Sequence, residues 1–313
     1  MILKPSLALC IPAYNAAQHL PRILMSAKNQ EIPFDEILVY DDCSNDNTKD
    51  VAESYGAKVI KGKINEGCSF GKNELAAYAK SDWLHFHDAD DDLLPNFTQE
   101  IHQWIEKNGN QYQVLLLNFR YVNFKSNLVL GEANHNVDAM HADSLKYAIE
   151  HKIVNFGVYK KEDLIKAGGF DLDKKVLYNE DNAFHIRLAT NGLKFDYLPK
   201  ITCINYQYEE SMSASNRLNC AKANYYVLEK AVKNSGKKYP IELASALLDV
   251  ATILAAENDW KYVKKALNLS KQTYSKIKFK GSNSFKLLSL INPLFGYWMR
   301  EKLIRFFKPS LRK

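Results

Sequence analysis

The chain has 313 residues, of which 46% are hydrophobic and 25% charged, and this composition excludes a disordered or fibrous protein. Its formal net charge of +6 hides an asymmetry, because residues 260–313 carry 14 Lys and Arg but one acidic residue, while residues 1–259 are net acidic. Five scattered cysteines without a CxxC pair argue against a disulfide framework or a zinc knuckle, and predict a reducing compartment.

The chain shows no candidate membrane span, since no apolar run approaches the ~20 residues that cross a bilayer. The N-terminal run Leu7–Ile11 is shorter than the apolar region of a signal peptide. We therefore expect a cytoplasmic protein, and the alternative of peripheral attachment to the inner membrane face stays open.

The first half alternates short apolar runs with helical patterns. Strands are predicted at residues 7–11, 37–40, 59–60 and 83–87, and helices near residues 20–27, 48–55 and 69–79. This rhythm is typical of an α/β fold, with a mostly parallel sheet flanked by helices on both faces.

The second half has a looser pattern. It predicts strands at 114–119, 156–160 and 201–208, an irregular insertion at 123–155, helices at 162–167 and 180–191, and a turn at Gly168-Gly169. Strand signals stop near residue 214, and helices are predicted at 240–257 and 259–275. We therefore predict an α/β domain over residues 1–213 and a helical, basic C-terminal region over residues 214–313.

Acidic residues follow two predicted strands and open a predicted helix. Four carboxylates gather within Asp88–Asp92, Asp41-Asp42 closes an earlier strand, and Glu180-Asp181 begins a late helix. Like charges repel, so a fold gains nothing by collecting them, whereas Mg²⁺ and Mn²⁺ prefer such oxygen ligands. Sites in open α/β sheets form beyond the carboxyl ends of the strands. This pattern predicts a cation and ligand site there.

Six short segments carry a resemblance to a known family. They are IPAYN (11–15), YDDCSNDNT (40–48), NEGCSFGKN (65–73), HDADD (87–91), GGFD (168–171) and NEDNAFHIRL (179–188). In this order and spacing the chain resembles the inverting family 2 glycosyltransferases, which use nucleotide sugars and have a GT-A, Rossmann-like fold. The resemblance covers roughly residues 6–210 and is silent on the rest.

The resemblance implies a donor-binding loop after the first strand. Pro12, Ala13, Tyr14 and Asn15 would wall the nucleobase, with backbone groups reading its edge. The alternative is an ordinary post-strand turn.

Further donor contacts are implied after the second strand. Asp41 and Asp42 would accept hydrogen bonds from the base and the ribose, and the alternative is that one of them caps the next helix. Asn65, Gly67 and Lys72 would lie near the base and the diphosphate. The family usually has Arg where Lys72 stands, so the charge is kept and the bidentate fork is lost. The alternative for Lys72 is a solvated lysine on a helix.

The implied metal site is the DxD element Asp88-Ala89-Asp90. Asp90 would ligate Mn²⁺ or Mg²⁺ across the diphosphate, and Asp88 would contact the ribose or a metal-bound water. Asp91 would bind the donor sugar, and Asp92 would face solvent. Such a metal, with Lys72, offsets charge on the departing nucleoside diphosphate.

The implied general base is Asp181 of the Glu180-Asp181 pair. It would take the proton of the acceptor hydroxyl as that oxygen attacks the anomeric carbon opposite the diphosphate. The alternative is a pair of acids in the first helical turn that interact with the helix dipole.

Two rival enzyme classes are weighed against this interpretation. His85-Phe86-His87-Asp88 approaches a zinc-hydrolase HxHxDH signature, but Ala89 stands where the Asp should be, so a hydrogen-bonded strand histidine is favoured. A sugar nucleotidyltransferase would show a Gly-rich N-terminal loop, which this chain lacks. Relatives often carry a histidine near the end of the core, around residues 206–213. Here Tyr208, a water or nothing takes its place.

The last thirty residues interleave apolar and basic side chains. Pro293 and Gly296 interrupt the run, and the pattern suits a helix lying on an anionic membrane surface through residues 285–313. The alternative is an apolar face packed on the protein. Nucleic-acid binding lacks a recognised module.

The sequence thus predicts a metal-dependent, inverting glycosyltransferase. The donor would be a nucleoside diphosphate sugar, with UDP favoured on family frequency. The acceptor would be a hydroxyl of a glycan or lipid-linked molecule in cell-surface polysaccharide synthesis. The alternative is a non-catalytic nucleotide-sugar binder or membrane-associated scaffold on the same fold.

Overall fold

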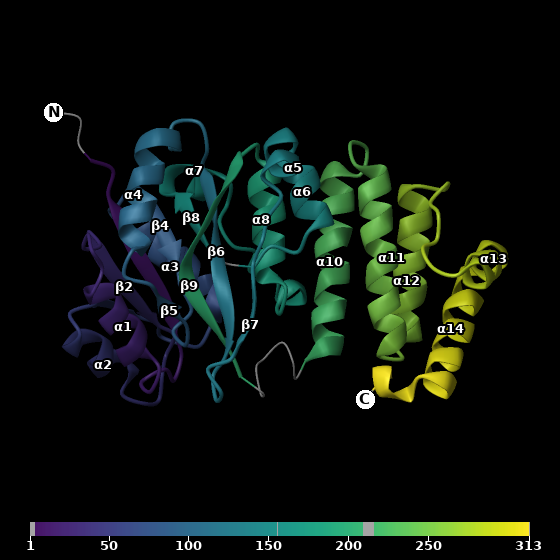
Figure 1. The fold of residues 1–313 in the computed structure, drawn as a ribbon, viewed down its shortest axis with the longest axis horizontal. Helices are drawn as coiled ribbons and strands as arrows, with labels where there is room; N and C mark the ends of the chain where they lie inside the picture. Colours follow the sequence, from purple (N-terminus) through teal and green to yellow (C-terminus); the bar gives the residue numbers. More distant parts are fainter. Residues whose placement is uncertain (1–3, 155, 209–215, 313) are drawn as a thin grey trace. The chain divides into compact units, whose positions relative to one another are not determined.

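The computed structural model describes residues 4–154, 156–208 and 216–312, which fall into two compact units (Figure 1). The first unit takes the described residues of 1–147, 153–172 and 187–209, and the second those of 148–152, 173–186 and 210–313. The boundary predicted between residues 213 and 214 lies outside the described residues, as does the 209–213 part of the segment where relatives carry a histidine.

Among the described residues, nine strands of the first unit form one sheet. They are β1 (Leu7–Ala13), β2 (Glu36–Asp41), β3 (Lys58–Lys61), β4 (Trp83–Phe86), β5 (Asp92–Leu93), β6 (Val114–Asn123), β7 (Val129–Glu132), β8 (Gly157–Lys160) and β9 (Phe195–Gln207). The order is β3-β2-β1-β4-β8-β6-β9-β5, with β7 paired to β6. Pairs among β3, β2, β1 and β4 are parallel, as is β6 with β9, while β8, β5 and β7 pair antiparallel.

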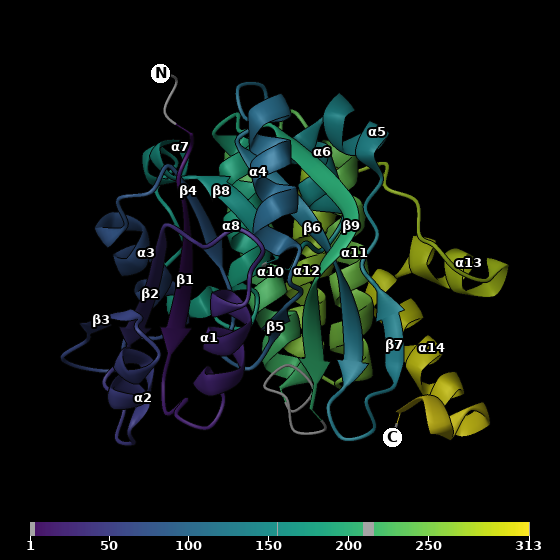
Figure 2. The same ribbon diagram turned by 60° about the vertical axis from the view of Figure 1, so that its left-hand side comes forward.

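Helices cover both faces of the parallel half of the sheet, in which Figure 2 shows β3, β2 and β1 side by side. Alternate residues of β1 pack into a core with α1 (Leu20–Lys28) and α4 (Phe97–Asn108). Helix α3 (Cys68–Tyr78) contacts β1 and β2, and α2 (Thr48–Ser54) lies against α1. The helix predicted near residues 20–27 is confirmed as α1, and its buried residues are Leu20, Ile23, Leu24 and Ala27.

The prediction of an irregular insertion at residues 123–155 is wrong. Strand β6 continues to Asn123, and the segment then forms β7, α5 (Val137–Ala142) and α6 (Ser144–Glu150). These elements are short, and β7 is mostly exposed, so they leave little periodicity in the sequence. The last strand also begins earlier than predicted, at Phe195.

The predicted turn after α7 (Lys161–Lys166) is confirmed. Gly168 and Gly169 have φ values of +89° and +59°, a region that favours glycine. A Cβ on Gly169 would come within 2.4 Å of the Asn73 side chain, which accepts a hydrogen bond from the Phe170 amide. The turn therefore fixes Phe170 beside α3.

The second unit is helical, as predicted for the C-terminal region. Its elements are the start of α8 (Glu180–Thr190), α10 (Arg217–Ser235), α11 (Pro240–Ala256), α12 (Trp260–Thr273), α13 (Asn283–Ile291), α14 (Pro293–Phe307) and 3-10 turns at Lys174–Val176 and Pro309–Arg312. Helices α10, α11 and α12 stand side by side (Figure 1). Within the described part of the chain, no helix combines the length and hydropathy needed to cross a bilayer.

Candidate functional site

The carboxyl ends of β1, β2 and β4 bring three of the predicted segments together. Ala13 at the end of β1 is in register with Asp41 at the end of β2, and its carbonyl accepts a hydrogen bond from the Asp42 amide at 2.9 Å. On the other side, the His87 amide donates to the Cys10 carbonyl of β1 at 3.0 Å. The expectation of a shared sheet edge for these loops is confirmed.

The loop after β1 is tied to the loop after β2. The backbone amide of Asn15 donates to the Ser44 hydroxyl at 2.9 Å. The side-chain oxygen Oδ1 of Asn15 accepts from the backbone amide of Asn45, also at 2.9 Å. Asn15 and Cys43 have φ values of +48° and +62°, which non-glycine residues rarely adopt. Tyr14 is 49% exposed. The loop is therefore held rigidly while it presents an aromatic surface to solvent.

Asp41 and Asp42 are both buried and both hold loops. Asp41 accepts a hydrogen bond from the Ser44 amide at 2.9 Å. The two oxygens of Asp42 accept from the amides of Glu66 and Gly67, at 2.9 and 2.7 Å. Neither carboxylate caps α2, whose first residue is Thr48, so the helix-cap alternative is wrong. Asp42 instead fixes the loop that leads into α3.

Replacing Asp42 with Ala should lower the free energy of unfolding by about 3 kcal/mol, since hydrogen bonds to charged groups are each worth about 1.5–3 kcal/mol. The amides of Glu66 and Gly67 would lose their acceptor, the buried carboxylate of Asp42. Urea unfolding measures the change. Asp50→Ala, at an exposed position on α2, is the control, and an Asp42 variant as stable as this control would contradict the assigned loop contacts.

Lys72 of α3 is buried, with only 2% of the residue exposed, so the alternative of a solvated lysine is wrong. Its Nζ lies 3.8 Å from Oδ1 of Asp88 and 5.1 Å from the centre of the Phe170 ring. A cation withdrawn from water in this way requires anionic or π partners. Gly67, at φ +93°, precedes the first turn of the same helix, and Asn65 before it is exposed.

The acidic segment after β4 places its carboxylates in different environments. The Asp88 side chain is 46% exposed and is the one nearest to Lys72. Burial, followed by the charge of Asp88, raises the pKa of Asp90 above its usual value. Ala89 packs against the apolar core between them. Burial and the nearby charge of Asp88 thus disfavour the charged form of Asp90, and a bound cation would favour it.

Asp91 is buried and holds β9 against this segment. Its two oxygens accept hydrogen bonds from the Asn205 side chain and the Tyr206 amide, both at 2.8 Å. Burial and the charges of Asp88 and Asp90 raise the pKa of Asp91 well above its usual range. Both carboxylate oxygens of Asp91 are thus already used in holding β9, whereas the sequence predicts that they contact the donor sugar. Asp92 is half-buried at the start of β5.

Sequence reasoning missed Arg22, which reaches the same segment from α1. Its guanidinium donates to the Asp90 carbonyl and, at 3.2 Å, to the Tyr208 hydroxyl. The guanidinium carbon lies 4.2 Å from the centre of the Tyr206 ring. The Tyr208 hydroxyl in turn donates to the Asp90 carbonyl at 3.3 Å. Of the alternatives left open for the absent histidine, the structure therefore places Tyr208 beside the acidic segment. Arg22 and Tyr208 together restrain the backbone of Asp90.

His85 and His87 form a buried hydrogen-bonded pair. Nδ1 of His85 donates to the Gly157 carbonyl at 2.8 Å, which leaves Nε2 to accept from Nδ1 of His87 at 2.9 Å. Burial lowers the pKa of His85 to about 4 and that of His87 well below its usual value, so both rings are neutral. Within the described residues, their ligand atoms and that of Cys203 lie within 4.8 Å of one another. A metal bound there would have to break the hydrogen bond between His85 and His87. The structure therefore favours the prediction of hydrogen-bonded strand histidines over that of metal ligands.

The Glu180-Asp181 pair lies in the first turn of α8, in the second unit. Tyr178 just before it has φ +75°, an unusual conformation for a bulky residue. Asn179 donates to the Cys220 carbonyl of α10 at 2.6 Å, and the Asn179 carbonyl accepts from the Ala183 amide. The start of α8 is therefore anchored to α10, and its amide groups favour negative charge on Asp181.

Comparison with known proteins supports the interpretation of this fold. The family model described as "Glycosyl transferase family 2" matches residues 8–166. An uncharacterized glycosyltransferase of Haemophilus influenzae is 26% identical over 234 residues, covering 72% of this chain and 77% of that protein. A hyaluronan synthase of Pasteurella multocida is 28% identical over 229 residues, covering 72% of this chain but 22% of that protein.

Two solved structures share this architecture. The crystal structure of S. aureus TarS 1–349 with UDP-GlcNAc has a TM-score of 0.63 at 17% identity, covering 96% of this chain and 91% of that one. A mannosyltransferase of Pyrobaculum calidifontis, in complex with GDP-Man and Mn²⁺, has a TM-score of 0.58 at 15% identity, covering 98% and 88%. The fold is thus GT-A, a mixed and largely parallel sheet flanked by helices, followed by C-terminal helices.

Proposed function

The chain belongs to glycosyl transferase family 2, and we propose that it is an inverting enzyme that moves a sugar from a nucleoside diphosphate sugar to an acceptor hydroxyl. The observation that carries the proposal is the buried Lys72, 3.8 Å from Asp88, beside the repelling pair Asp88 and Asp90. This arrangement gathers both signs of charge where a metal diphosphate would need them.

Asp90 and Asp88 are the residues that would hold Mn²⁺ or Mg²⁺. Their carboxylates match the oxygen ligands of hard cations. Burial and the charge of Asp88 raise the pKa of Asp90, and a bound cation would stabilise its charged form. The metal would stabilise negative charge on the diphosphate leaving group. The Mn²⁺ in the mannosyltransferase of the same fold supports a divalent cation in general.

The donor nucleotide would lie over the loop after β1. The exposed Tyr14 ring, with Pro12 and Ala13, would contact the base, while the rigid ties of Asn15 and Asp41 keep the loop in shape. We propose UDP as the nucleotide. The TarS complex with UDP-GlcNAc supports this choice, and the GDP-Man complex on the same fold names the main competitor.

Asp181 would act as the general base toward the acceptor hydroxyl, with Glu180 beside it. The helix N-terminus favours the carboxylate form that a base needs. We propose a glycan or lipid-linked acceptor in cell-surface polysaccharide synthesis, which the similarity to a hyaluronan synthase supports. The enzyme would work in the cytoplasm, at the inner face of an anionic membrane, through residues 285–313.

The proposal is tested by calorimetry with UDP, GDP and dTDP, each with and without Mn²⁺. Tight binding of UDP only when Mn²⁺ is present is the expected result. Tight binding of GDP or dTDP instead would replace the proposed nucleotide and keep the transferase. No binding of any nucleotide with metal would overturn the proposed function.

Arg22→Gln is expected to weaken Mn²⁺-dependent nucleotide binding by about tenfold, because misplacing a binding group by about 1 Å can cost up to 10²-fold. The variant removes the donor that restrains the Asp90 carbonyl and stacks on Tyr206. Titration calorimetry measures the affinity. Lys28→Gln, on the same helix, is the control, and Arg22→Lys should recover part of the loss. Equal affinities for Arg22→Gln and Lys28→Gln would refute the positioning role.

A further inference from the structure

Helix α14 packs on the second unit through its polar side. Tyr297 and Glu301 are its buried large residues, and the Tyr297 hydroxyl donates to the Leu248 carbonyl of α11 at 3.1 Å. Arg305 donates to the Ala256 carbonyl at the end of α11, at 2.6 Å. A surface helix normally turns its apolar stripe to the core. In α14 the buried residues are Gly296, Tyr297 and Glu301, so the large apolar side chains do not face the core.

The apolar side of α14 faces outward instead. Phe295 and Trp298 are about two-fifths exposed, Leu303 is half exposed, and Phe306 and Phe307 are 78% and 71% exposed. On α13 the exposed apolar residues, all between 63% and 79% exposed, are Leu287, Leu290 and Ile291. Large exposed apolar side chains gathered on two helices that contact each other are typical of an interaction site. The alternative of an apolar face packed on the protein does not describe these residues.

The charge around this surface is positive. Glu301, the one acidic residue of the segment 260–313, is 1% exposed and accepts hydrogen bonds from Arg312 at 2.7 and 2.9 Å and from Arg300 at 3.2 Å. Arg312 makes the two shorter contacts and offsets the single charge of this carboxylate, so the charge of Arg300 is in excess. The basic residues that remain favour an anionic partner, and their mixture with exposed aromatic rings is typical of helices in a bilayer interface.

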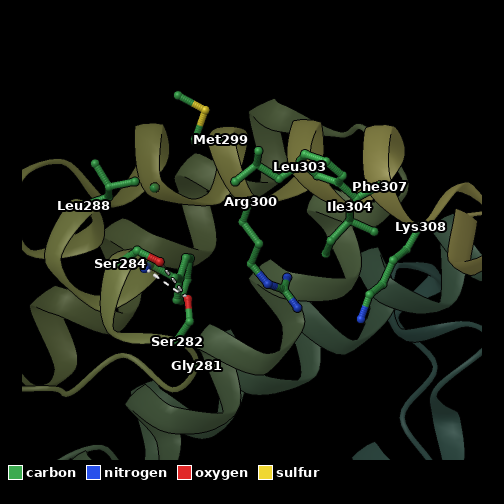
Figure 3. A pocket seen from close by; sticks show the side chains of 12 residues that line it. Gly281, Ser282, Ser284, Leu288, Met299, Arg300, Leu303, Ile304, Phe307 and Lys308 are labelled. Atoms are coloured by element: carbon green, nitrogen blue, oxygen red, sulfur yellow. Dashed lines mark hydrogen bonds between the residues drawn. The ribbon is translucent and has the colours of Figure 1, made fainter.

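A groove of about 480 Å³ runs between α13 and α14, within the size range of small-molecule sites. Its apolar lining includes Phe285, Leu288 and Leu303. Figure 3 shows the side chains of Arg300, on α14, and of Lys308, just after the last residue of α14, on the same side, with Ile304 between them. The groove thus combines an apolar floor with two cations at its edge.

From these features we infer that α13 and α14 lie in the interface of an anionic leaflet, and that the groove takes one acyl chain of an anionic phospholipid. The lipid phosphate would sit between Arg300 and Lys308, while Trp298, Ile291 and Phe306 enter the headgroup region. This inference deepens the proposed function, on which it rests for the place of the enzyme at a membrane.

Sedimentation of the full chain with vesicles tests the inference. Binding to phosphatidylglycerol-containing vesicles should exceed binding to pure phosphatidylcholine vesicles and should fall with added salt. Ile291→Ser and Phe306→Ser should each weaken it about tenfold, since burying a large apolar side chain is worth roughly 1.5–3 kcal/mol. Ile64→Ser and Leu128→Ser, similarly exposed in the first unit, are the matched controls.

The groove is tested separately from the surface. A basic residue near an anionic surface contributes about fivefold to binding. Arg300→Gln/Lys308→Gln, which removes both charges of the groove, should weaken vesicle binding by about this factor per charge. Lys276→Gln/Lys278→Gln, which removes two exposed charges elsewhere, should weaken it less. Insertion of the surface is tested with lipids brominated on the acyl chain, which should quench tryptophan fluorescence in the parent chain and not in Trp298→Phe.

Absence of vesicle binding, or equal losses for surface and control variants, would overturn the inference. So would a lipid-independent dimer that Phe306→Ser dissociates, because a second copy would then cover the face. Nucleotide binding measured on the same samples keeps the two failures apart: a chain that binds UDP with Mn²⁺ but no vesicles retains the proposed function.

Discussion

Replacing Asp181 with Asn is expected to lower the rate of sugar transfer by about 10²–10⁴-fold, the range that a general base contributes. The amide keeps the shape of the carboxylate but cannot take the proton of the acceptor hydroxyl. Nucleotide binding should stay near the parental value, because the base acts on the acceptor. Release of nucleoside diphosphate in the presence of acceptor, with calorimetry alongside, measures both quantities.

Two control variants separate this role from the alternative of a first-turn acid. Asp50 occupies the first turn of α2, so Asp50→Asn removes a similar interaction with a helix dipole, worth about 0.3–1 kcal/mol. Glu180→Gln, the neighbour on α8, should reduce transfer less than Asp181→Asn. If Asp181→Asn keeps full transfer and changes only stability, by as much as Asp50→Asn does, then Asp181 is not the base.

The parallel half of the sheet could be predicted from the sequence because it is built from local signals. Residues 7–11 and 37–40 are continuous apolar runs, as expected for strands buried on both faces. The segment 123–155 gave no such signal. In α5 the buried residue is Met140, and the helix begins at an Asn136 side chain that accepts from the Ala139 amide. A helix defined by one cap and one buried side chain has no period to detect.

The strand-end residues could be predicted for a topological reason. Once β1, β2 and β4 are parallel neighbours, their carboxyl ends must meet, so Asp41 and Asp88 fall on one edge whatever their side chains do. The contact between Arg22 and Tyr208 joins residues 186 positions apart and depends on how β9 and α1 pack. No spacing in the sequence encodes that contact. The burial of Lys72 was missed for the same reason, because it depends on Phe170 being turned onto α3 by the Gly168-Gly169 turn.

Replacing Asp90 with Asn should weaken Mn²⁺-dependent nucleotide binding by at least 10²-fold, equivalent to about 2.7 kcal/mol. The variant loses a charged oxygen ligand and half of the paired negative charge. Calorimetry with UDP and Mn²⁺ measures the loss. Asp92→Asn, two residues along the same segment, is the control and should bind like the parent. Full retention of metal-dependent binding in Asp90→Asn would move the metal site elsewhere.

The same variant should not lose stability, and this separates function from folding. Burial and the charge of Asp88 raise the pKa of Asp90 in the folded chain, so the folded state holds its proton more tightly than the unfolded state does. Stability contributed by this group therefore falls as the pH rises from 3.8 through the raised pKa, and at neutral pH the carboxylate destabilises the fold. Asn removes that charge. Urea unfolding at pH 7 with EDTA should show Asp90→Asn at least as stable as the parent, whereas added Mn²⁺ should stabilise the parent alone. A variant that is clearly less stable than the parent in EDTA would mean that Asp90 is kept for the fold rather than for the cation.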